Sequence, residues 1–284
     1  MTAARERGGD GARPTRAAPH ERRPRLDQRL VDDGLAETRA RAQALVLTGD
    51  VLVDDVPVTK AGTRVRPESR VRVRVRGGGS RYVSRGGDKL AGALADLAPQ
   101  GLDPRGLHCL DVGASTGGFT DCLLQAGAAS VVAVDVGYGQ LHPRLRDDPR
   151  VLVRERTNAR DLEAAALPHA IDLAVFDASF ISLRLLLAPV AAVAPRAQVL
   201  ALVKPQFEVG RERVGKGGVV RDDAERAAAV DAVAAAAAAL GYRERARVDS
   251  RVHGPKGNRE IFLWLAPARA DGGPTAPRAG GAGC

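Results

Sequence analysis

The chain has 284 residues, which is enough for one large domain and a small one. A hydrophobic fraction of 44% permits a sizeable core and excludes a wholly disordered chain. No segment approaches the roughly 18 consecutive apolar residues of a membrane-spanning helix, so an integral membrane protein is excluded. The chain carries 43 Lys and Arg against 34 Asp and Glu, which gives a net charge of +9.

The positive charge is nearly all arginine and predicts a polyanionic partner, because a guanidinium group binds oxyanions through two parallel hydrogen bonds. A high-GC composition bias toward Ala, Arg, Gly and Val is the alternative explanation, so the charge needs local support. The three cysteines, Cys109, Cys122 and Cys284, include no close pair, which excludes zinc ribbons and disulfide scaffolds. A cytoplasmic setting is therefore expected.

Both ends of the chain are predicted to be disordered. Residues 1–24 form a basic arm of Arg, Gly, Pro and Ala, and residues 268–284 are rich in Gly, Pro and Ala. Neither segment can bury enough apolar surface to offset the entropy lost on ordering.

Residues 25–76 are predicted to form a compact basic domain. The spacing of Leu26, Leu30 and Val31 indicates a first helix, and residues 38–47 a second. Asp54-Asp55 between two short apolar runs is typical of a hairpin turn.

Residues 70–76 alternate strictly between Arg and Val, which predicts a strand with valines on one face and arginines on the other. Any half-buried strand can alternate in this way. Four cations on one face, however, need either an anion or open water.

A glycine-rich linker at 77–83 leads into a larger domain at 84–267, where apolar strands alternate with Ala-rich helices. This alternation predicts an α/β, Rossmann-like fold with a parallel sheet covered on both faces, and ligands bind at the carboxyl ends of such strands. Strands are expected at 108–112, 130–134, 151–154, 171–176, 198–203, 243–249 and 261–265, and a long helix at 222–240.

The glycine-rich segment 111–119 lies between a predicted strand and a predicted helix, which is typical of a cofactor loop. Asp135, at the end of the next strand, is placed to accept hydrogen bonds from ribose hydroxyls. The spacing does not fit the G-x-G-x-x-G of dinucleotide sites, so S-adenosylmethionine is favoured over NAD. A purely structural turn is the alternative.

Two ionisable residues follow neighbouring strands, Asp177 after 171–176 and Lys204 after 198–203, so both should face the same crevice. Alone, Asp177 would be taken as a helix cap and Lys204 as an exposed side chain. The segment 210–217 is similar to a phosphate-binding loop, but Gly217 replaces the required hydroxyl, and a loop facing the substrate is expected instead.

These features together resemble the TlyA family of rRNA 2′-O-methyltransferases, also named haemolysin A, over roughly residues 25–265. The segment Arg25-Leu-Asp-Gln-Arg-Leu is similar to an S4-type RNA-binding domain. The other matching segments begin at Tyr82 (YVSRGGDKL), Gly113 (GASTGGFTD), Asp135 (DVGYGQL), Glu155 (ERTNAR) and Leu202 (LVKPQFEVG). Two departures are the arm at 1–24 and Ala178, where the family usually has Leu.

The resemblance implies an FtsJ-like Rossmann methyltransferase core with S-adenosylmethionine as cofactor. It places a catalytic tetrad at Lys89, Asp177, Lys204 and Glu260. The implied cofactor residues are Asp111, Gly113, Ala114, Ser115, Thr116, Gly117, Gly118, Phe119, Asp135, Asn158 and Ala159. The expected RNA-binding residues are Arg25, Arg29, Arg39, Arg41, Arg70, Arg72, Arg74 and Arg85.

The expected activity is 2′-O-methylation of a ribose, a cytidine by resemblance, in 16S and/or 23S rRNA of the 30S and 50S subunits. No metal and no membrane are expected to take part, and a monomer is favoured. Whether Lys204 acts as a base or as an electrostatic stabiliser is open at this stage. The rival functions are a non-catalytic, ribosome-associated RNA-binding factor and a membrane-active haemolysin.

Overall fold

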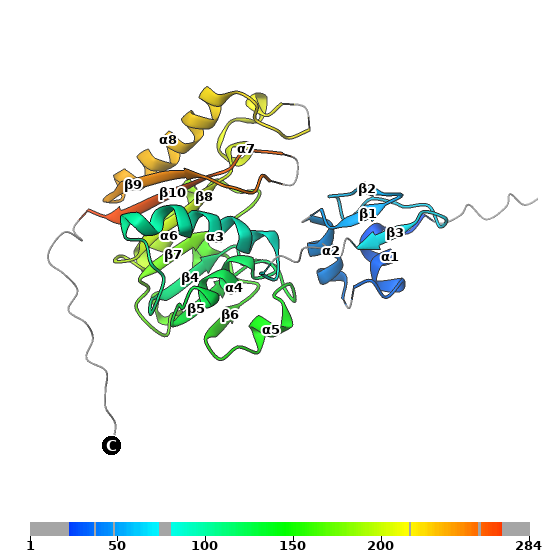
Figure 1. The fold of residues 1–284 in the computed structure, drawn as a ribbon, viewed down its shortest axis with the longest axis horizontal. Helices are drawn as coiled ribbons and strands as arrows, with labels where there is room; N and C mark the ends of the chain where they lie inside the picture. Colours follow the sequence, from blue (N-terminus) through cyan, green and yellow to red (C-terminus); the bar gives the residue numbers. More distant parts are fainter. Residues whose placement is uncertain are drawn as a thin grey trace, which may run out of the picture.

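The computed structural model describes residues 23–36, 38–47, 49–73, 81–215, 217–254 and 257–268, which form two separate sheets (Figure 1). Residues 1–22, 74–80 and 269–284 lie outside the described residues. The predictions for most of the basic arm, the end of the Arg/Val strand, most of the linker and most of the tail fall there. Within the described residues, no helix is both long enough and apolar enough to cross a membrane.

The N-terminal domain packs two helices against a small antiparallel sheet of order β2-β1-β3. Its elements are α1 (Leu26–Asp32), α2 (Arg39–Leu47), β1 (Val51–Val53), β2 (Val56–Pro57) and β3 (Val71–Val73). Leu26, Leu30 and Val46 are fully buried in its core. The hairpin prediction is confirmed, because Asp54 and Asp55 adopt positive φ angles of 49° and 65° between β1 and β2, as a tight two-residue turn requires.

The larger domain is built on a seven-stranded sheet of order β6-β5-β4-β7-β8-β10-β9. Its strands are β4 (His108–Val112), β5 (Ser130–Val134), β6 (Val151–Arg154), β7 (Leu173–Phe176), β8 (Gln198–Val203), β9 (Tyr242–Asp249) and β10 (Ile261–Pro267). Four of the predicted strands, β4, β5, β6 and β8, have the predicted bounds, since each is a short apolar run ended by turn residues.

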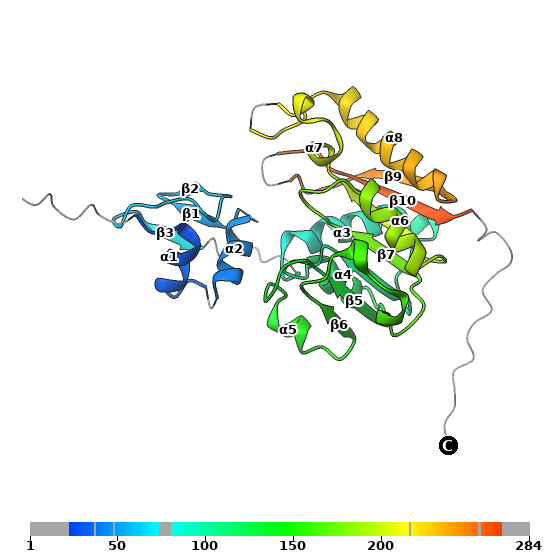
Figure 2. The ribbon, with the colours of Figure 1, turned by 180° about the vertical axis from the view of Figure 1, so that it is seen from behind.

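Helices cover both faces of this sheet. The main ones are α3 (Arg85–Leu97), α4 (Gly118–Gln125), α5 (Pro143–Arg146), α6 (Arg184–Val193), α7 (Pro205–Glu208) and α8 (Asp223–Ala239). Short 3-10 helices lie at Ala98–Gln100, Ala159–Asp161, Ala164–Ala166 and Arg211–Arg213. Residues of α3 and α4 share one hydrophobic cluster and those of α6 and α8 another, and the two clusters lie on opposite faces (Figures 1 and 2).

The expectation of a wholly parallel sheet is wrong at one edge. β4 to β8 are parallel, but β10 pairs antiparallel with both β8 and β9. The described residues between β9 and β10 form no helix, and two neighbouring strands joined without a crossover pair in antiparallel orientation.

Asp27 is a buried charge that joins the two helices of the N-terminal domain. Its carboxylate, 0% exposed, accepts hydrogen bonds from Arg25, Arg39 Nε at 3.1 Å and Gln43 Nε2 at 3.0 Å. These hydrogen bonds and opposite charges hold the pKa of Asp27 well below its usual range, although burial opposes them. The ionised carboxylate therefore stabilises the packing of α1 on α2.

We predict that Asp27→Asn lowers the free energy of unfolding of this domain by roughly 1–3 kcal/mol at neutral pH, since two guanidinium groups lose their counter-charge. The depressed pKa means that this stability is present above the ordinary Asp pKa of about 4 and is lost below it as the pH falls. Amide hydrogen exchange over residues 23–73 of the intact chain measures it. Asp32→Asn, on the exposed face of the same helix, is the matched control; equal exchange in both variants would contradict the prediction.

Candidate active site

The glycine-rich segment forms a tight loop from β4 into α4, as predicted. Gly113 and Gly117 have φ angles of 89° and 91°, which side chains with a Cβ rarely adopt. A Cβ on Gly113 would lie 3.0 Å from the backbone of Ala178, and one on Gly117 would lie 2.3 Å from Leu145 Cδ1. The loop therefore fits closely between the segments that follow β7 and β5.

Asp135, directly after β5, holds the other side of this loop. Its Oδ2 accepts the Ser115 N–H at 2.8 Å and its Oδ1 accepts the Gly137 N–H at 2.6 Å. A small pocket opens beside it, lined by Ala114, Ser115, Ala133, Asp135, Leu141, Val153 and Glu155. Each carboxylate oxygen of Asp135 keeps a second lone pair, so the group can still accept hydrogen bonds from a ligand.

The remaining cofactor candidates lie around the loop in different settings. Thr116 is buried, and the ring of Phe119 packs on Phe262 at 6.0 Å between ring centroids. Asn158 caps the 3-10 helix Ala159–Asp161 by accepting the Arg160 N–H. Asn158 and Ala159 follow β6 but are not among the residues that line the pocket.

Asp111 is fully buried in β4, directly before the loop. Its Oδ2 accepts hydrogen bonds from Thr120 N at 2.9 Å and Thr120 Oγ1 at 2.7 Å. Its Oδ1 is buried and has no hydrogen-bond partner among the described residues. Burial raises the pKa of Asp111 to about 7. A buried acceptor of this kind favours a ligand that brings a positive charge or a donor.

The four residues of the expected tetrad form two ion pairs. Lys89 Nζ lies 2.5 Å from Glu260 Oε2, and Lys204 Nζ lies 2.7 Å from Asp177 Oδ1. Lys89, Lys204 and Glu260 are all buried, and Asp177 is partly exposed. Each buried lysine thus has a carboxylate of its own, which offsets the cost of removing its charge from water.

Lys204 makes two further contacts with the segment that follows β7. Its Nζ donates to the backbone oxygen of Asp177 at 3.1 Å and to Ser179 Oγ at 2.7 Å. The contact with Asp177 Oδ1 is an ion pair without the alignment of a hydrogen bond. Three oxygens around one nitrogen match an ammonium group, which has three donors and no acceptor.

The first turn of α3 brings the cofactor loop and the tetrad together. A Cβ on Gly86 would lie 3.5 Å from both Asp177 Oδ2 and Phe119 Cδ1. Lys89 follows one turn later on the same helix, and Arg85, an expected RNA-binding residue, is the first residue of α3. The predicted cofactor loop and the predicted catalytic residues therefore lie around one point at the carboxyl edge of the sheet.

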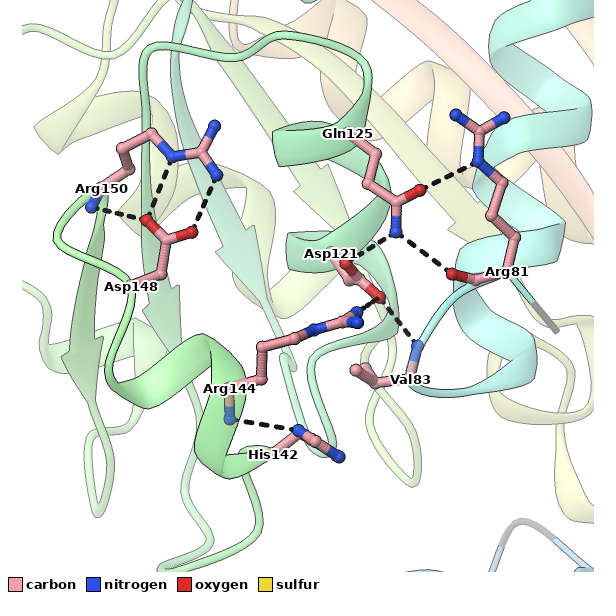
Figure 3. A network of polar contacts seen from close by, with 8 residues as sticks. All are labelled: Arg81, Val83, Asp121, Gln125, His142, Arg144, Asp148 and Arg150. Carbon is pink, nitrogen blue, oxygen red and sulfur yellow. Dashed lines mark hydrogen bonds and ion pairs between the residues drawn. The ribbon is translucent and has the colours of Figure 1, made fainter. Parts of the chain in front are cut away.

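A network of hydrogen bonds and ion pairs around Asp121 connects the start of the larger domain to helix α4, which follows the glycine-rich loop (Figure 3). Asp121 Oδ2 accepts hydrogen bonds from Val83 N at 2.8 Å and from Arg144 Nη2 at 2.7 Å. Its Oδ1 accepts a hydrogen bond from Gln125 Nε2 at 2.9 Å. Gln125 in turn accepts a hydrogen bond from Arg81 Nε at 2.9 Å. Residues 81–83, the end of the predicted linker, are thereby fixed to α4.

The expected RNA-binding arginines of the N-terminal domain differ in what they contact. Arg25 and Arg39 neutralise Asp27, Arg29 pairs with Asp33, and Arg72 pairs with Asp55. Within the described ranges, the side chains of Arg41 and Arg70 contact no carboxylate. Arg74 lies outside the described residues.

Two family models match the chain: FtsJ-like methyltransferase over residues 82–266 and S4 domain over residues 24–71. The chain belongs to the FtsJ-like methyltransferase family. This methyltransferase is 49% identical to the Mycobacterium tuberculosis (strain ATCC 25618 / H37Rv) "16S/23S rRNA (cytidine-2′-O)-methyltransferase TlyA" over 245 residues, 86% of this chain and 90% of that protein.

Two further relatives span the chain to a similar extent. The Bacillus subtilis (strain 168) "Putative rRNA methyltransferase YqxC" is 43% identical over 86% of each chain. The solved structure of "Putative hemolysin from Streptococcus thermophilus" is 37% identical, with a TM-score of 0.65 over 88% of this chain and 90% of that one. The family and the two-domain fold therefore extend over nearly all of the described residues.

S-adenosylmethionine is the cofactor of FtsJ-like methyltransferases, and the residues around the loop fit it. The carboxylate of Asp135 suits ribose hydroxyls, and the buried Oδ1 of Asp111 suits a cationic ligand. Among the described residues, no group of three or more His, Cys, Asp or Glu could hold a metal ion.

Sequence reasoning on the methyltransferase missed five residues of this site. Ser179 contacts Lys204, and the pocket is also lined by Ala133, Leu141, Val153 and Glu155. Glu155 had a usable signal, since it directly follows β6 and opens a family-like segment. Leu141 had a similar signal, as the last residue of the family-like segment that begins at Asp135. Ser179 had none, because its contact with Lys204 joins segments distant in the sequence.

We predict that the free energy of unfolding of this methyltransferase, without cofactor, falls by about 2–3 kcal/mol between pH 5 and pH 8 because of Asp111. Its folded pKa is raised to about 7, so the folded state binds more protons than the unfolded state, and stability is lost as the pH rises. Denaturant unfolding at several pH values measures this fall.

Asp111→Asn should remove that fall. The control Asp172→Asn, which alters a carboxylate that accepts the His108 N–H at the opposite end of β4, should keep it. A fall of equal size in wild type and Asp111→Asn would show that Asp111 is not its source.

Proposed function

We propose that this protein transfers the methyl group of S-adenosylmethionine to the 2′-hydroxyl of a cytidine ribose in ribosomal RNA, in the 16S and/or 23S molecule. The observation that carries the proposal is the position of Lys204. Its Nζ is held by Asp177 and Ser179, beside the Lys89–Glu260 pair and at the same sheet edge as the cofactor loop. The M. tuberculosis relative, whose name states this reaction, supports the choice of substrate.

A 2′-hydroxyl is a weak nucleophile at neutral pH. When bound, S-adenosylmethionine supplies an activated methyl group on a sulfonium. The protein's task is therefore to align the ribose oxygen with that group, to exclude water and to accommodate the charge that develops on the oxygen. Transfer of the methyl group to the ribose oxygen would leave a neutral thioether, and the hydroxyl proton would pass to solvent water.

Lys204 and Asp177 are the groups proposed to touch the ribose. The Nζ–Oδ1 contact is not an aligned hydrogen bond, so one N–H of Lys204 can turn toward the 2′-oxygen. Asp177 has the most exposed side chain of the four residues, so its carboxylate can accept a hydrogen bond from a ribose hydroxyl. Lys89, on α3, and Glu260 form an ion pair and neutralise each other's charge.

RNA is proposed to be held by both domains, with boundaries near 25–76 and 84–267. Arg41 and Arg70, whose side chains contact no carboxylate within the described part of the N-terminal domain, are proposed to supply phosphate contacts, together with Arg85 at the start of α3. Phe180, 78% exposed and three residues after Asp177, offers a ring face on which a base can stack. Ribosomal subunits are the proposed partners, which implies a cytoplasmic enzyme.

The first test is transfer of labelled methyl from S-adenosylmethionine to purified 30S and 50S subunits. Wild type should place the label in a 2′-O-methylcytidine, and Lys204→Ala should lower transfer by at least about a thousandfold while cofactor binding persists. Retained transfer in the variant would overturn the catalytic assignment. If the wild type binds the cofactor but transfers no methyl group to either subunit, the proposed substrate is wrong.

The pH dependence of a single turnover distinguishes the two possible roles of Lys204. The three oxygens around its Nζ favour an ammonium that stabilises the developing alkoxide. We therefore expect a single-turnover rate that stays level across neutral pH. A rate that rises tenfold per pH unit across the neutral range and depends on Lys204 would assign the role of base instead.

A further inference from the structure

Glu208 is a buried carboxylate to which the proposed mechanism gives no part. It ends the short helix α7, which begins directly after Lys204, and its side chain is almost fully enclosed at 1% exposed. Burial raises its pKa, and the hydrogen bonds that it accepts oppose that shift. Burying a carboxylate costs free energy unless its oxygens accept hydrogen bonds or pair with a cation. The partners of Glu208 therefore indicate its role.

All of those partners lie in one segment, the three residues 182–184. Glu208 Oε2 accepts the Ser182 hydroxyl at 2.6 Å, and Oε1 accepts the Leu183 N–H at 2.7 Å. Arg184 adds an ion pair at 3.5 Å to Oε2 and donates to the backbone oxygen of Glu208 at 3.3 Å. Leu183 is the residue that precedes α6, so Glu208 satisfies a backbone donor that the helix start leaves open.

The segment held in this way, residues 178–183, runs from Asp177 to α6 along the site. At its beginning Lys204 Nζ binds the backbone oxygen of Asp177 and Ser179 Oγ. At its end Glu208 binds Ser182 and Leu183. The segment is thus fastened at both ends to one short stretch, 204–208, which carries the proposed catalytic lysine.

Phe180, between the two points of attachment, has a strained backbone. Its φ of 67° lies in the left-handed region, which costs a residue with a side chain of order 1 kcal/mol and persists only when the surroundings impose it. Its ring packs on that of Phe207, 5.3 Å between centroids, and is otherwise open to solvent. On the C-terminal side of Phe180, the bonds of Glu208 to Ser182 and Leu183 act together with the packing of Leu183 in the core to hold this conformation.

We propose that Glu208 is a positioning residue for methyl transfer: it fixes the 178–183 segment so that Ser179 and the Asp177 backbone hold Lys204 Nζ in place and Phe180 faces the RNA. The inference rests on the proposed function. Its effect falls on the lysine side of the site, because the cofactor side is built from other segments, the 113–119 loop, Asp135 and the pocket residues.

The experiment compares Glu208→Ala, Glu208→Gln and the control Asp172→Asn in the full chain with ribosomal subunits as substrate. In Glu208→Ala we expect kcat to fall about ten- to a hundredfold, as for a misplaced reacting group. The dissociation constant of S-adenosylmethionine should stay within about twofold. Glu208→Gln, whose amide oxygen can still accept the Leu183 N–H, should recover most of kcat. Asp172→Asn, a carboxylate bonded to a backbone N–H far from Lys204, should leave kcat unchanged.

A second measurement does not depend on activity. Amide hydrogen exchange of residues 178–186 should speed up at least about tenfold in Glu208→Ala and much less in Glu208→Gln, while residues 113–125 keep their protection. If Glu208→Ala fails to fold, Ser182→Ala replaces it. This variant removes the 2.6 Å bond to Glu208 and the longer contacts of Arg184 with Ser182 Oγ but keeps the Leu183 N–H bond, so it should show the same changes at a smaller magnitude.

Faster exchange with an unchanged kcat, or equal loss of kcat and cofactor binding, would overturn the inference, because Glu208 would then serve only the stability of the fold. Failure of the proposed function looks different: the wild type would itself transfer no methyl group to either subunit. The exchange result would still report whether Glu208 holds the segment.

Discussion

The parallel pairing of β4 with β5 on one side and β7 on the other is the constraint on which the site depends. The chain leaves β4 between two strands that run in the same direction, so the loops after all three meet at one edge. Gly113 N and Ala114 N both donate to Val134 O of β5, and a Cβ on Gly113 would touch the segment after β7. The cofactor loop is therefore confined by both neighbours.

Buried charge is the second feature of this edge. Two lysines and two carboxylates are placed as separate pairs, Lys89 with Glu260 and Lys204 with Asp177. Such pairs stabilise a fold only weakly, because their attraction is offset by the loss of hydration. Their presence together at one edge of the sheet points to chemistry, and the carboxylates of Asp111 and Glu208 nearby have pKa values raised by burial.

The arginines of the N-terminal domain show that positive charge alone does not mark an RNA surface. Arg25 and Arg39 hold the buried Asp27, and Arg72 on β3 pairs with Asp55 in the hairpin turn. The overall charge of +9 predicts a polyanionic partner, but which guanidinium groups face that partner depends on the carboxylates folded beside them.

The sequence by itself determined the local elements and the residues at their ends. Periodicity and turn residues placed four strands and the hairpin within their observed bounds, and Asp177 and Lys204 were recognised because each follows an apolar strand. Lys89 and Glu260 came only from family resemblance. The tertiary structure alone decided the antiparallel pairing of β10, the pairing of each lysine with its carboxylate, and the attachment of residues 182–184 to Glu208. These are contacts between segments far apart along the chain, and a local pattern carries no information on which distant groups will meet.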